Sequence, residues 1–297
     1  MKTYGELVRE LRIKKGISQK QLYEKIMSKS YAIRFEQGKH EISFYLLKQI
    51  LEQLLMEVDE FIYVFNGYHA SEIEQFYYDY GEKGNQNDID GLISMRTELK
   101  KNSNDIQTEL RIAELTARIE QLTEYKKTGV YSKKVIDKQT LMIIQEHLSN
   151  VQTWTLGELR LFANTLDYID YERKSEYFDT LLRSIDRYKY FERGRKVICT
   201  LLINEIHELV LSNDVADAEH LMKKLRVFIT GVDEMFFRNC HLYYEGLILH
   251  LKGEQKNGCK KVNQAIEIFG ALDYHHQAEL SRTNYQKLCV NIEKNKC

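Results

Sequence analysis

The stretch SQKQLYEKIMSKSYAIRFEQGKHEIS, residues 18–43, decides the fold of the first part of the chain. Ser18 and Gln21 have the S-x-x-Q spacing of a capping box, in which each side chain bonds the other residue's backbone N–H at a helix start. A turn at residues 27–29 separates this first helix from a second, at about residues 30–37. The second helix ends at Gly38, because glycine readily adopts the left-handed conformation that closes a helix. Two short helices joined by a tight turn predict a helix-turn-helix.

In a helix-turn-helix the second helix enters the major groove of DNA, so its outward face should carry side chains that contact bases. Arg34 can bond guanine through two parallel hydrogen bonds, and Tyr31 can contact a thymine methyl group or a phosphate. The alternatives are a solvated Arg34 and a packing role for Tyr31. Gln19 stands at a helix start, where a phosphate can also meet free backbone N–H groups. The predicted DNA-binding residues are Gln19, Lys20, Lys29, Ser30, Tyr31, Arg34 and Lys39.

The charge of the chain is unevenly distributed along its length. Residues 1–40 contain ten Lys or Arg and four Asp or Glu, a balance of +6. The net charge of the whole chain is −1, so the remaining residues carry −7. A basic first segment joined to an acidic body indicates an anionic partner for that segment alone, although ordinary surface charge would look the same.

Composition favours an all-helical chain without a membrane span. The 297 residues contain no proline and 15 glycines, too few turn formers for a β-rich fold of this length. No apolar run is long enough to span a bilayer, and the N-terminal MKTYGELVREL does not resemble a targeting peptide. The five cysteines form no CxxC pair, and we expect free thiols in a reducing cytoplasm. Cys199, Cys240, Cys259 and Cys289 are expected to be small core residues, and Cys297 to be exposed.

Beyond Gly67 the chain consists of amphipathic segments of helical length separated by short polar breaks, the first of them at residues 81–87. About ten or eleven helices are expected, stacked as antiparallel hairpins. The segment LYYEGLILHLKGEQKNGCKKVNQAIEIFG, residues 242–270, has the small and large residues of a tetratricopeptide-like repeat at Gly246, Gly253, Gly258, Val262 and Ala265. Such repeats stack into a solenoid with a concave groove.

Two motifs carry a resemblance to known families. Arg12, the run Gly16-Ile17-Ser18-Gln19 and the run Phe35-Glu36-Gln37-Gly38 resemble the phage-repressor-type helix-turn-helix of many bacterial regulators. That resemblance implies an internal ion pair between Arg12 and Glu36. The longer string SKSYAIRFEQGKHEIS, residues 28–43, is similar to that of Rgg/MutR-like regulators of streptococci and their relatives. Ala32-Ile33 departs from the usual Ile-Ser of those regulators, and which of the two is buried stays open.

The resemblance implies a homodimeric cytoplasmic transcription factor whose repeats bind a short, hydrophobic signalling peptide. A peptide groove needs polar groups for the peptide backbone and apolar pockets for its side chains. Polar residues in the middle of apolar helical segments are candidates for those groups, and the alternative is that they bond inside the stack or lie on the surface. The predicted peptide-binding residues are Arg160, Asn164, Asn204, Arg238, Asn239, Tyr243 and Asn284.

No motif of an enzyme or of a metal site occurs in the sequence. The nine histidines have no ligand spacing with a third residue, and no P-loop, G-x-S-x-G or H-E-x-x-H is present. We therefore expect no catalytic activity, no metal and no cofactor.

The sequence predicts an all-α protein with two domains. Residues 1–66 form a five-helix helix-turn-helix domain, and residues 67–297 form a tetratricopeptide-like solenoid for peptide binding and dimerisation. The expected function is peptide-controlled regulation of transcription at a double-stranded DNA operator, as in quorum sensing, without a membrane partner. Two alternatives stay open: the repeats could be a scaffold for another protein, or they could only dimerise the chain.

Overall fold

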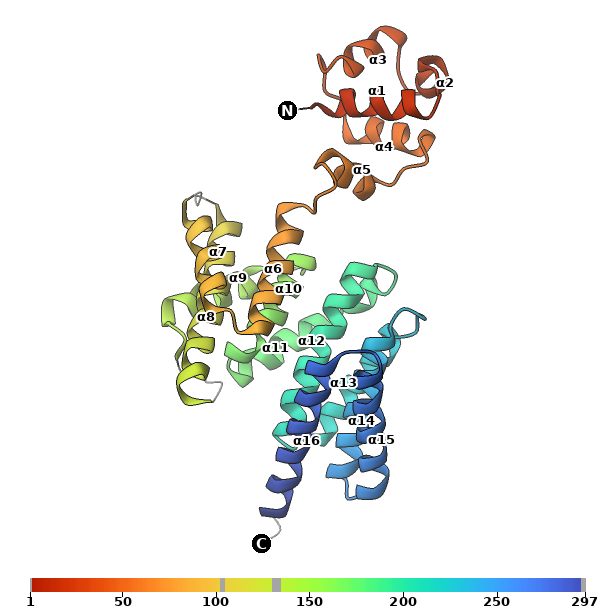
Figure 1. Ribbon diagram of the computed structural model, residues 1–297. Coiled ribbons are helices and arrows are strands. Elements are labelled where there is room, and N and C mark those ends of the chain that lie inside the picture. The colour runs from red at the N-terminus through yellow and green to blue at the C-terminus, as the bar shows by residue number, and fades with distance from the viewer. Residues whose placement is uncertain (1, 102–104, 130–134, 295–297) are drawn as a thin grey trace. The chain divides into compact units, whose positions relative to one another are not determined.

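The computed structural model describes residues 2–101, 105–129 and 135–294. Within these ranges every regular element is a helix (Figure 1), which confirms the all-α prediction. The chain divides into two compact units, Met1–Asp88 and Ile89–Cys297. The domain boundary expected after residue 66 lies at the end of the fifth helix, and it stays a prediction of where the DNA-binding domain ends.

The first unit begins with the five short helices that the sequence indicates. A longer sixth helix follows them. This helix continues through Gly81, so the break in helical structure expected at residues 81–87 is wrong for residues 81–86. The helix ends at Gln86, because the next residue, Asn87, adopts a left-handed φ of 56°. The six helices are α1 (Tyr4–Lys14), α2 (Gln19–Tyr23), α3 (Lys29–Glu36), α4 (Phe44–Gln53), α5 (Val58–Phe65) and α6 (Glu72–Gln86).

Side-chain caps and left-handed glycines set the limits of the first helices. Ser18 and Gln21 form the expected capping box, and Ser28 accepts a hydrogen bond from the backbone N–H of Tyr31 at the start of α3. Gly16 and Gly38 follow the ends of α1 and α3 with φ values of 68° and 70°. Because residues with a Cβ rarely adopt such values, these two glycines fix where the helices stop.

The core of the first unit decides which face of α3 points outward. Ala32 and Phe35 are each 1% exposed, whereas Ile33 is only half-buried. α1 crosses α3 very closely: a Cβ added to Gly5 would lie 1.8 Å from the carbonyl oxygen of Phe35. The core residues of α1–α5 and the turn after α4 are Leu7, Val8, Leu22, Tyr23, Ala32, Phe35, Leu47, Ile50, Leu51, Leu54 and Phe61.

The second unit continues as a series of helices in which chain neighbours pack together (Figure 1). With α6, eleven α-helices follow Gly67 in the described ranges. Those of the second unit are α7 (Ile89–Lys101), α8 (Ile106–Thr128), α9 (Lys138–Asn150), α10 (Leu156–Thr165), α11 (Tyr171–Leu182), α12 (Glu192–Leu211), α13 (Val215–Phe228), α14 (Met235–Leu251), α15 (Gln255–Ala271) and α16 (His275–Lys294). Two 3₁₀ turns, Leu166–Tyr168 and Ile185–Tyr188, flank α11.

The repeat pattern of residues 242–270 corresponds to the hairpin α14–α15. A Cβ on Gly258 would lie 2.6 Å from the carbonyl oxygen of Gly246, and a Cβ on Gly246 would lie 2.8 Å from Val262 Cγ2. The small residues therefore let the two helices approach at backbone distance, as a helical repeat requires. Among the residues searched, no helix is long and apolar enough to cross a membrane.

Candidate DNA interface and repeat-domain groove

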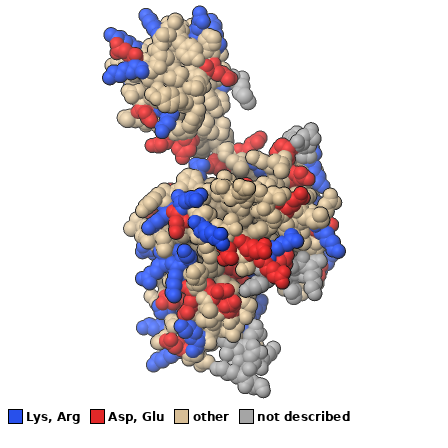
Figure 2. Space-filling model, turned by 180° about the vertical axis from the view of Figure 1, so that it is seen from behind, with Lys and Arg blue, Asp and Glu red and all other residues tan. Residues whose placement is uncertain are grey.

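The outward face of α3 carries three of the predicted DNA-binding side chains. Lys29, Ser30 and Arg34 are exposed, while Ala32 and Phe35 of the same helix are buried in the core. Lys20 in α2 and Lys39 after Gly38 are also exposed. Figure 2 shows Lys and Arg side chains along the outer edge of this unit, with Asp and Glu between them. This face combines one guanidinium group on the helix surface with ammonium groups around it, as phosphate and base contacts require.

A buried carboxylate network joins α1, α2 and α3 behind that face. Arg12 Nε and Nη2 donate to Glu36 Oε1 and Oε2 at 2.6 and 2.8 Å, and Arg12 Nη1 donates to the Ile17 carbonyl oxygen at 2.8 Å. Gln19 Nε2 and the Tyr23 hydroxyl also donate to Glu36, at 2.7 and 2.9 Å. Arg12 is 8% exposed and Glu36 2%. The ion pair that the family resemblance implies thus lies at the centre of a larger set of bonds.

Hydrogen bonding keeps this buried carboxylate ionised. Burial alone would raise the pKa of Glu36, but the hydrogen bonds from Arg12, Gln19 and Tyr23 outweigh it and hold that pKa below its ordinary value. Burial, with a smaller effect of the Glu36 charge, raises the pKa of the Tyr23 hydroxyl, which therefore stays a donor. The network fixes α3 against α1 and α2 through a charge that is fully satisfied by donors.

The side chains of Gln19 and Tyr31, both predicted DNA contacts, form hydrogen bonds within the first unit. The Gln19 amide nitrogen bonds Glu36, so a phosphate contact would have to use the rest of that amide, and it stays a prediction. The Tyr31 hydroxyl donates to the Glu41 carbonyl oxygen at 3.1 Å, and its ring lies 5.8 Å from the ring of His40. Tyr31 therefore supports the turn that follows α3.

Sequence reasoning did not identify Tyr23 and His40. Tyr23 occupies an apolar position of α2, and only its hydroxyl, next to a buried acid, shows its part in the network. His40 Nε2 lies 3.5 Å from Arg34 Nη1, at the end of the exposed face of α3. The distance between His40 and Arg34 depends on the path of the chain after Gly38, which a residue pattern does not reveal.

In the repeat unit, Asn164, Arg238, Asn239 and Tyr243 of the predicted peptide-binding set donate hydrogen bonds to other residues of the chain. Asn164 Nδ2 donates to Glu114 Oε1 at 2.6 Å, and Arg238 donates to two carbonyl oxygens of residues 229 and 230, each at 2.8 Å. Asn239 and Tyr243 are buried and donate to the carbonyl oxygens of residues 265 and 281, each at 2.8 Å. Asn204 is exposed, and Arg160 and Asn284 are half-buried. Arg238 is also exposed, and a peptide contact by any of the seven stays a prediction.

The partner of Asn164 is a carboxyl group deep in the stack. Glu114 is 1% exposed, and its Oε2 has no hydrogen-bond partner in the described part of the chain. Burial raises the pKa of Glu114 to about 8, against the opposing effects of Asn164, Arg111 and Arg160. The group is therefore largely protonated at neutral pH, and the predicted peptide residues Arg160 and Asn164 surround it.

We expect the wild type to lose stability as the pH rises into the alkaline range, and Glu114→Gln to be free of this loss. A carboxyl group whose pKa is raised on folding stabilises the fold below its unfolded pKa of about 4.5, and this contribution is lost as pH rises through about 8. At pH 9 the free energy of unfolding of the variant should exceed that of the wild type by on the order of 5 kcal/mol, since the shift from 4.5 to about 8 is roughly 3.5 pKa units at about 1.4 kcal/mol each. Urea unfolding followed by the fluorescence of Trp154 at pH 5, 7 and 9 measures this. Glu109→Gln, on an exposed position of the same helix, should keep the wild-type pH dependence; equal behaviour of the two variants would contradict the prediction.

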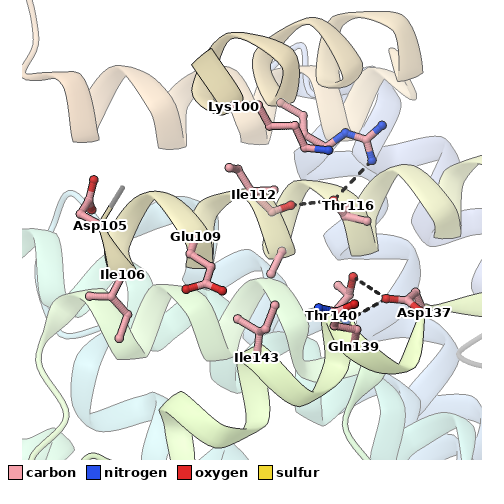
Figure 3. Close-up of a pocket in the computed structure, with 12 residues that line it drawn as sticks. Lys100, Asp105, Ile106, Glu109, Ile112, Thr116, Asp137, Gln139, Thr140 and Ile143 are labelled. Carbon is pink, nitrogen blue, oxygen red and sulfur yellow. Dashed lines mark hydrogen bonds between the residues drawn. The ribbon is translucent and has the colours of Figure 1, made fainter. Parts of the chain in front are cut away.

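A groove of about 620 Å³ opens along α8, with α7 and α9 as its walls (Figure 3). Arg96 and Lys100 of α7 line one side, and Arg96 Nη1 donates to Thr116 Oγ1 of α8 at 3.3 Å. Glu109 and three isoleucines, Ile106, Ile112 and Ile143, line the rest together with Asp105, Ala113, Asp137, Gln139 and Thr140. The volume is in the range of small-ligand sites, and the lining offers apolar side chains between opposite charges. Sequence reasoning missed this groove because it depends on how α7, α8 and α9 are spaced.

Among the residues searched, no group of three His, Cys, Asp or Glu side chains could hold a metal ion.

Comparisons with known proteins agree with both parts of the chain. The model of the C-terminal domain of the helix-turn-helix-type transcriptional regulator Rgg matches residues 92–283, and a helix-turn-helix model matches residues 8–61. A crystal structure from Listeria monocytogenes EGD-e, described as a transcriptional regulator, shares 32% identity over 98% of both chains, with a TM-score of 0.89.

Two more distant structures share the fold. The SHP pheromone receptor Rgg2 of Streptococcus dysgalactiae has 19% identity, covers 96% of this chain and 99% of its own, and gives a TM-score of 0.75. PrgX in its complex with iCF10 has 14% identity, with 99% and 98% coverage and a TM-score of 0.74. At these identities the likeness concerns the fold alone.

Proposed function

The chain belongs to the Rgg family of helix-turn-helix transcriptional regulators, and from this premise we propose that it is a dimeric, peptide-controlled DNA-binding regulator in the cytoplasm. The observation that carries the proposal is the buried Arg12–Glu36 network, which holds the outward face of α3 in place. In the dimer, two copies of α3 would reach half-sites about 34 Å apart, one turn of DNA, or a multiple of it.

The DNA part of the proposal assigns base reading to Arg34. Its guanidinium group is exposed on α3, and guanine offers two acceptors in the major groove at the spacing of a guanidinium fork. Lys20, Lys29 and Lys39 would contact phosphates, whose binding depends on salt more than on sequence. Gln19, Ser30 and Tyr31 complete the proposed interface, with the domain boundary after residue 66.

The peptide part of the proposal rests on the repeat unit. Rgg2 is named as a pheromone receptor, and PrgX has been crystallised with iCF10, so receptors of signalling molecules share this fold. In this chain the half-buried and exposed Arg160, Asn204 and Asn284 offer polar groups, and the groove along α8 offers apolar surface between charges. A peptide would change transcription only by binding one of two conformations more tightly, because equal affinity for both shifts nothing.

We expect Arg34→Ala to lose sequence discrimination. One good contact between an arginine and a guanine contributes about 1–3 kcal/mol, so affinity for the preferred duplex should fall roughly tenfold to a hundredfold. Affinity for unrelated DNA should change little, because the lysines remain. Gel shifts at one fixed salt concentration would compare duplexes selected from a random pool by the wild type with scrambled duplexes. Lys48→Ala on α4, whose side chain is 61% exposed, is the control and should bind as the wild type does. Unchanged discrimination in Arg34→Ala would refute the assignment.

The peptide part is tested by calorimetry with the full-length chain. The probes are synthetic peptides translated from short reading frames beside the gene. Saturable heat with one of them, reduced in Asn204→Ala, is the expected result. Absence of heat with every peptide, together with a stable complex with a folded protein, would favour the alternative that the repeats serve as an interaction scaffold.

A further inference from the structure

The last three helices bring two cysteines, a histidine and a tyrosine together. α14 contributes His250, α15 contributes Cys259, and α16 contributes Tyr285 and Cys289. α15 packs against both α14 and α16 (Figure 1). The turn between α15 and α16 lies at residues 272–274, so the two cysteines are at similar distances along the chain from it, on opposite sides. They therefore stand at nearly the same level of an antiparallel pair.

Hydrogen bonds join His250 to Tyr285 and Cys289, and Asn263 to Cys259. His250 Nε2 lies 3.8 Å from Cys289 Sγ, and His250 Nδ1 lies 3.2 Å from the Tyr285 hydroxyl oxygen. Burial raises the pKa of the Tyr285 hydroxyl, and the neighbouring thiols of Cys259 and Cys289 raise it further. Asn263 Nδ2 also donates to Cys259 Sγ at 3.4 Å. A histidine with its proton on Nδ1 can accept the Cys289 thiol proton at Nε2, while tyrosine and asparagine donors stabilise negative charge on sulfur.

The other two described cysteines provide a contrast within the same unit. Cys199 and Cys240 are 0% and 4% exposed, and burial raises the pKa of each thiol to about 12. They stay protonated and shielded from reagents. Cys259 and Cys289 are only half-buried, so the sequence expectation that these two are core residues is met only in part. Cys297 lies outside the described residues.

We propose that Cys259 and Cys289 form a thiol modification site that reacts with a small peroxide and closes as a disulfide between α15 and α16. In the first step His250 takes the thiol proton, and the Cys289 thiolate attacks one oxygen of hydrogen peroxide. The O–O bond breaks, Cys289 becomes a sulfenic acid, and the released hydroxide takes up a proton to give water. In the second step Cys259 sulfur attacks Cys289 sulfur and displaces the hydroxyl group, which leaves as a second water. Two thiols and one peroxide thus give one disulfide and two waters.

The site does not depend on the proposed peptide or DNA contacts, because its chemistry involves only the four side chains and the oxidant. A bond between α15 and α16 would restrict how these two helices move against each other. It would therefore change the mobility of the last repeat.

Peptide mapping tests the proposal on the full chain carrying Cys297→Ser. After hydrogen peroxide treatment and alkylation, trypsin cuts after Lys256, Lys260, Lys287 and Lys294, which isolates NGCK and LCVNIEK. The expected product is these two peptides joined by a disulfide, with Cys199 and Cys240 still alkylated. Cys259→Ser should instead accumulate a sulfenic acid at Cys289 that dimedone traps, and Cys289→Ser should form neither product.

His250→Gln separates the assisted reaction from accidental oxidation. If His250 accepts the proton, crosslinking of the variant at neutral pH should be slower than that of the wild type by about tenfold or more. The difference should shrink as the pH approaches the ordinary pKa of a thiol, where the thiolate forms without a base. Cys240→Ser is the matched control and should crosslink at the wild-type rate. The proposal is overturned if no joined peptide forms, if Cys199 and Cys240 oxidise as fast as Cys289, or if the sulfenic acid persists in the presence of Cys259.

Discussion

Replacing Gly5 by alanine is expected to disrupt the first unit while the repeat unit stays folded. The new Cβ would lie 1.8 Å from the Phe35 carbonyl oxygen and 2.6 Å from its carbonyl carbon, and both are backbone atoms that no side-chain rotation can move. α1 and α3 must therefore separate by more than an ångström, which opens the core around Phe35. We expect a loss of more than about 3 kcal/mol, at or beyond the upper range of overpacking.

The single tryptophan allows the unfolding of the two units to be measured separately. Trp154 lies in the repeat unit, so its fluorescence should report the same urea midpoint in Gly5→Ala as in the wild type. Circular dichroism should show loss of the helices of the first unit at lower urea, and DNA binding should disappear. Gly81→Ala is the control: a Cβ there meets nothing within 4 Å, and alanine should stabilise α6 by about 0.5–1 kcal/mol. Equal midpoints for Gly5→Ala and Gly81→Ala would contradict the close crossing.

Glu36→Ala is expected to destabilise the first unit by about 3–5 kcal/mol, the cost of breaking a buried ion pair from one side. Arg12 would keep a buried charge, with only its bond to the Ile17 carbonyl oxygen, and the Tyr23 hydroxyl would lose its acceptor. Urea unfolding of the first unit measures the loss. A double variant, Arg12→Met with Glu36→Leu, should recover a large part of it because no charge is left unpaired. Glu10→Ala, at a surface ion pair with Lys14, is the control and should have little effect.

The pH dependence of the same carboxylate gives an independent check. Because its pKa is lowered on folding, Glu36 stabilises the fold above its unfolded pKa of about 4.5, and this contribution is lost as pH falls through the lower folded value. Glu36→Gln should therefore be less stable than the wild type at pH 6, and the difference should shrink in acid. A difference that stays constant down to pH 3 would show that the charge of Glu36 does not stabilise the fold.

The sequence predicted the helices of the first unit well because their limits are local. Ser18 and Gly38 act on neighbours a few residues away, and the structure has each of them at the expected helix end. The sequence could not show which of Ala32 and Ile33 is buried, because that depends on how closely α1 approaches α3 at Gly5. The partners Gln19 and Tyr23 of Glu36 were likewise out of reach, because they depend on the angle between α2 and α3.

In the repeat unit the sequence predicted the hairpin pattern but could not locate a ligand site. Polar residues such as Asn239 and Tyr243 stood out among apolar neighbours, yet carbonyl oxygens of the following helices accept their hydrogen bonds. Only packing shows which polar group meets a carbonyl and which stays open. The groove along α8 depends on the spacing of three helices, and a single helical face carries no sign of it.

The network around Glu36 separates the residues that hold α3 from those that would read DNA. Arg12, Gln19 and Tyr23 bond Glu36 on the inner side of α3, whereas Lys29 and Arg34 lie on its exposed face; of the network, only Gln19 is also a proposed phosphate contact. The outward positions can therefore be exchanged without disturbing the scaffold. A regulator built in this way can acquire a new operator by a few surface substitutions, so paralogues in one genome could diverge in target genes while keeping the same architecture.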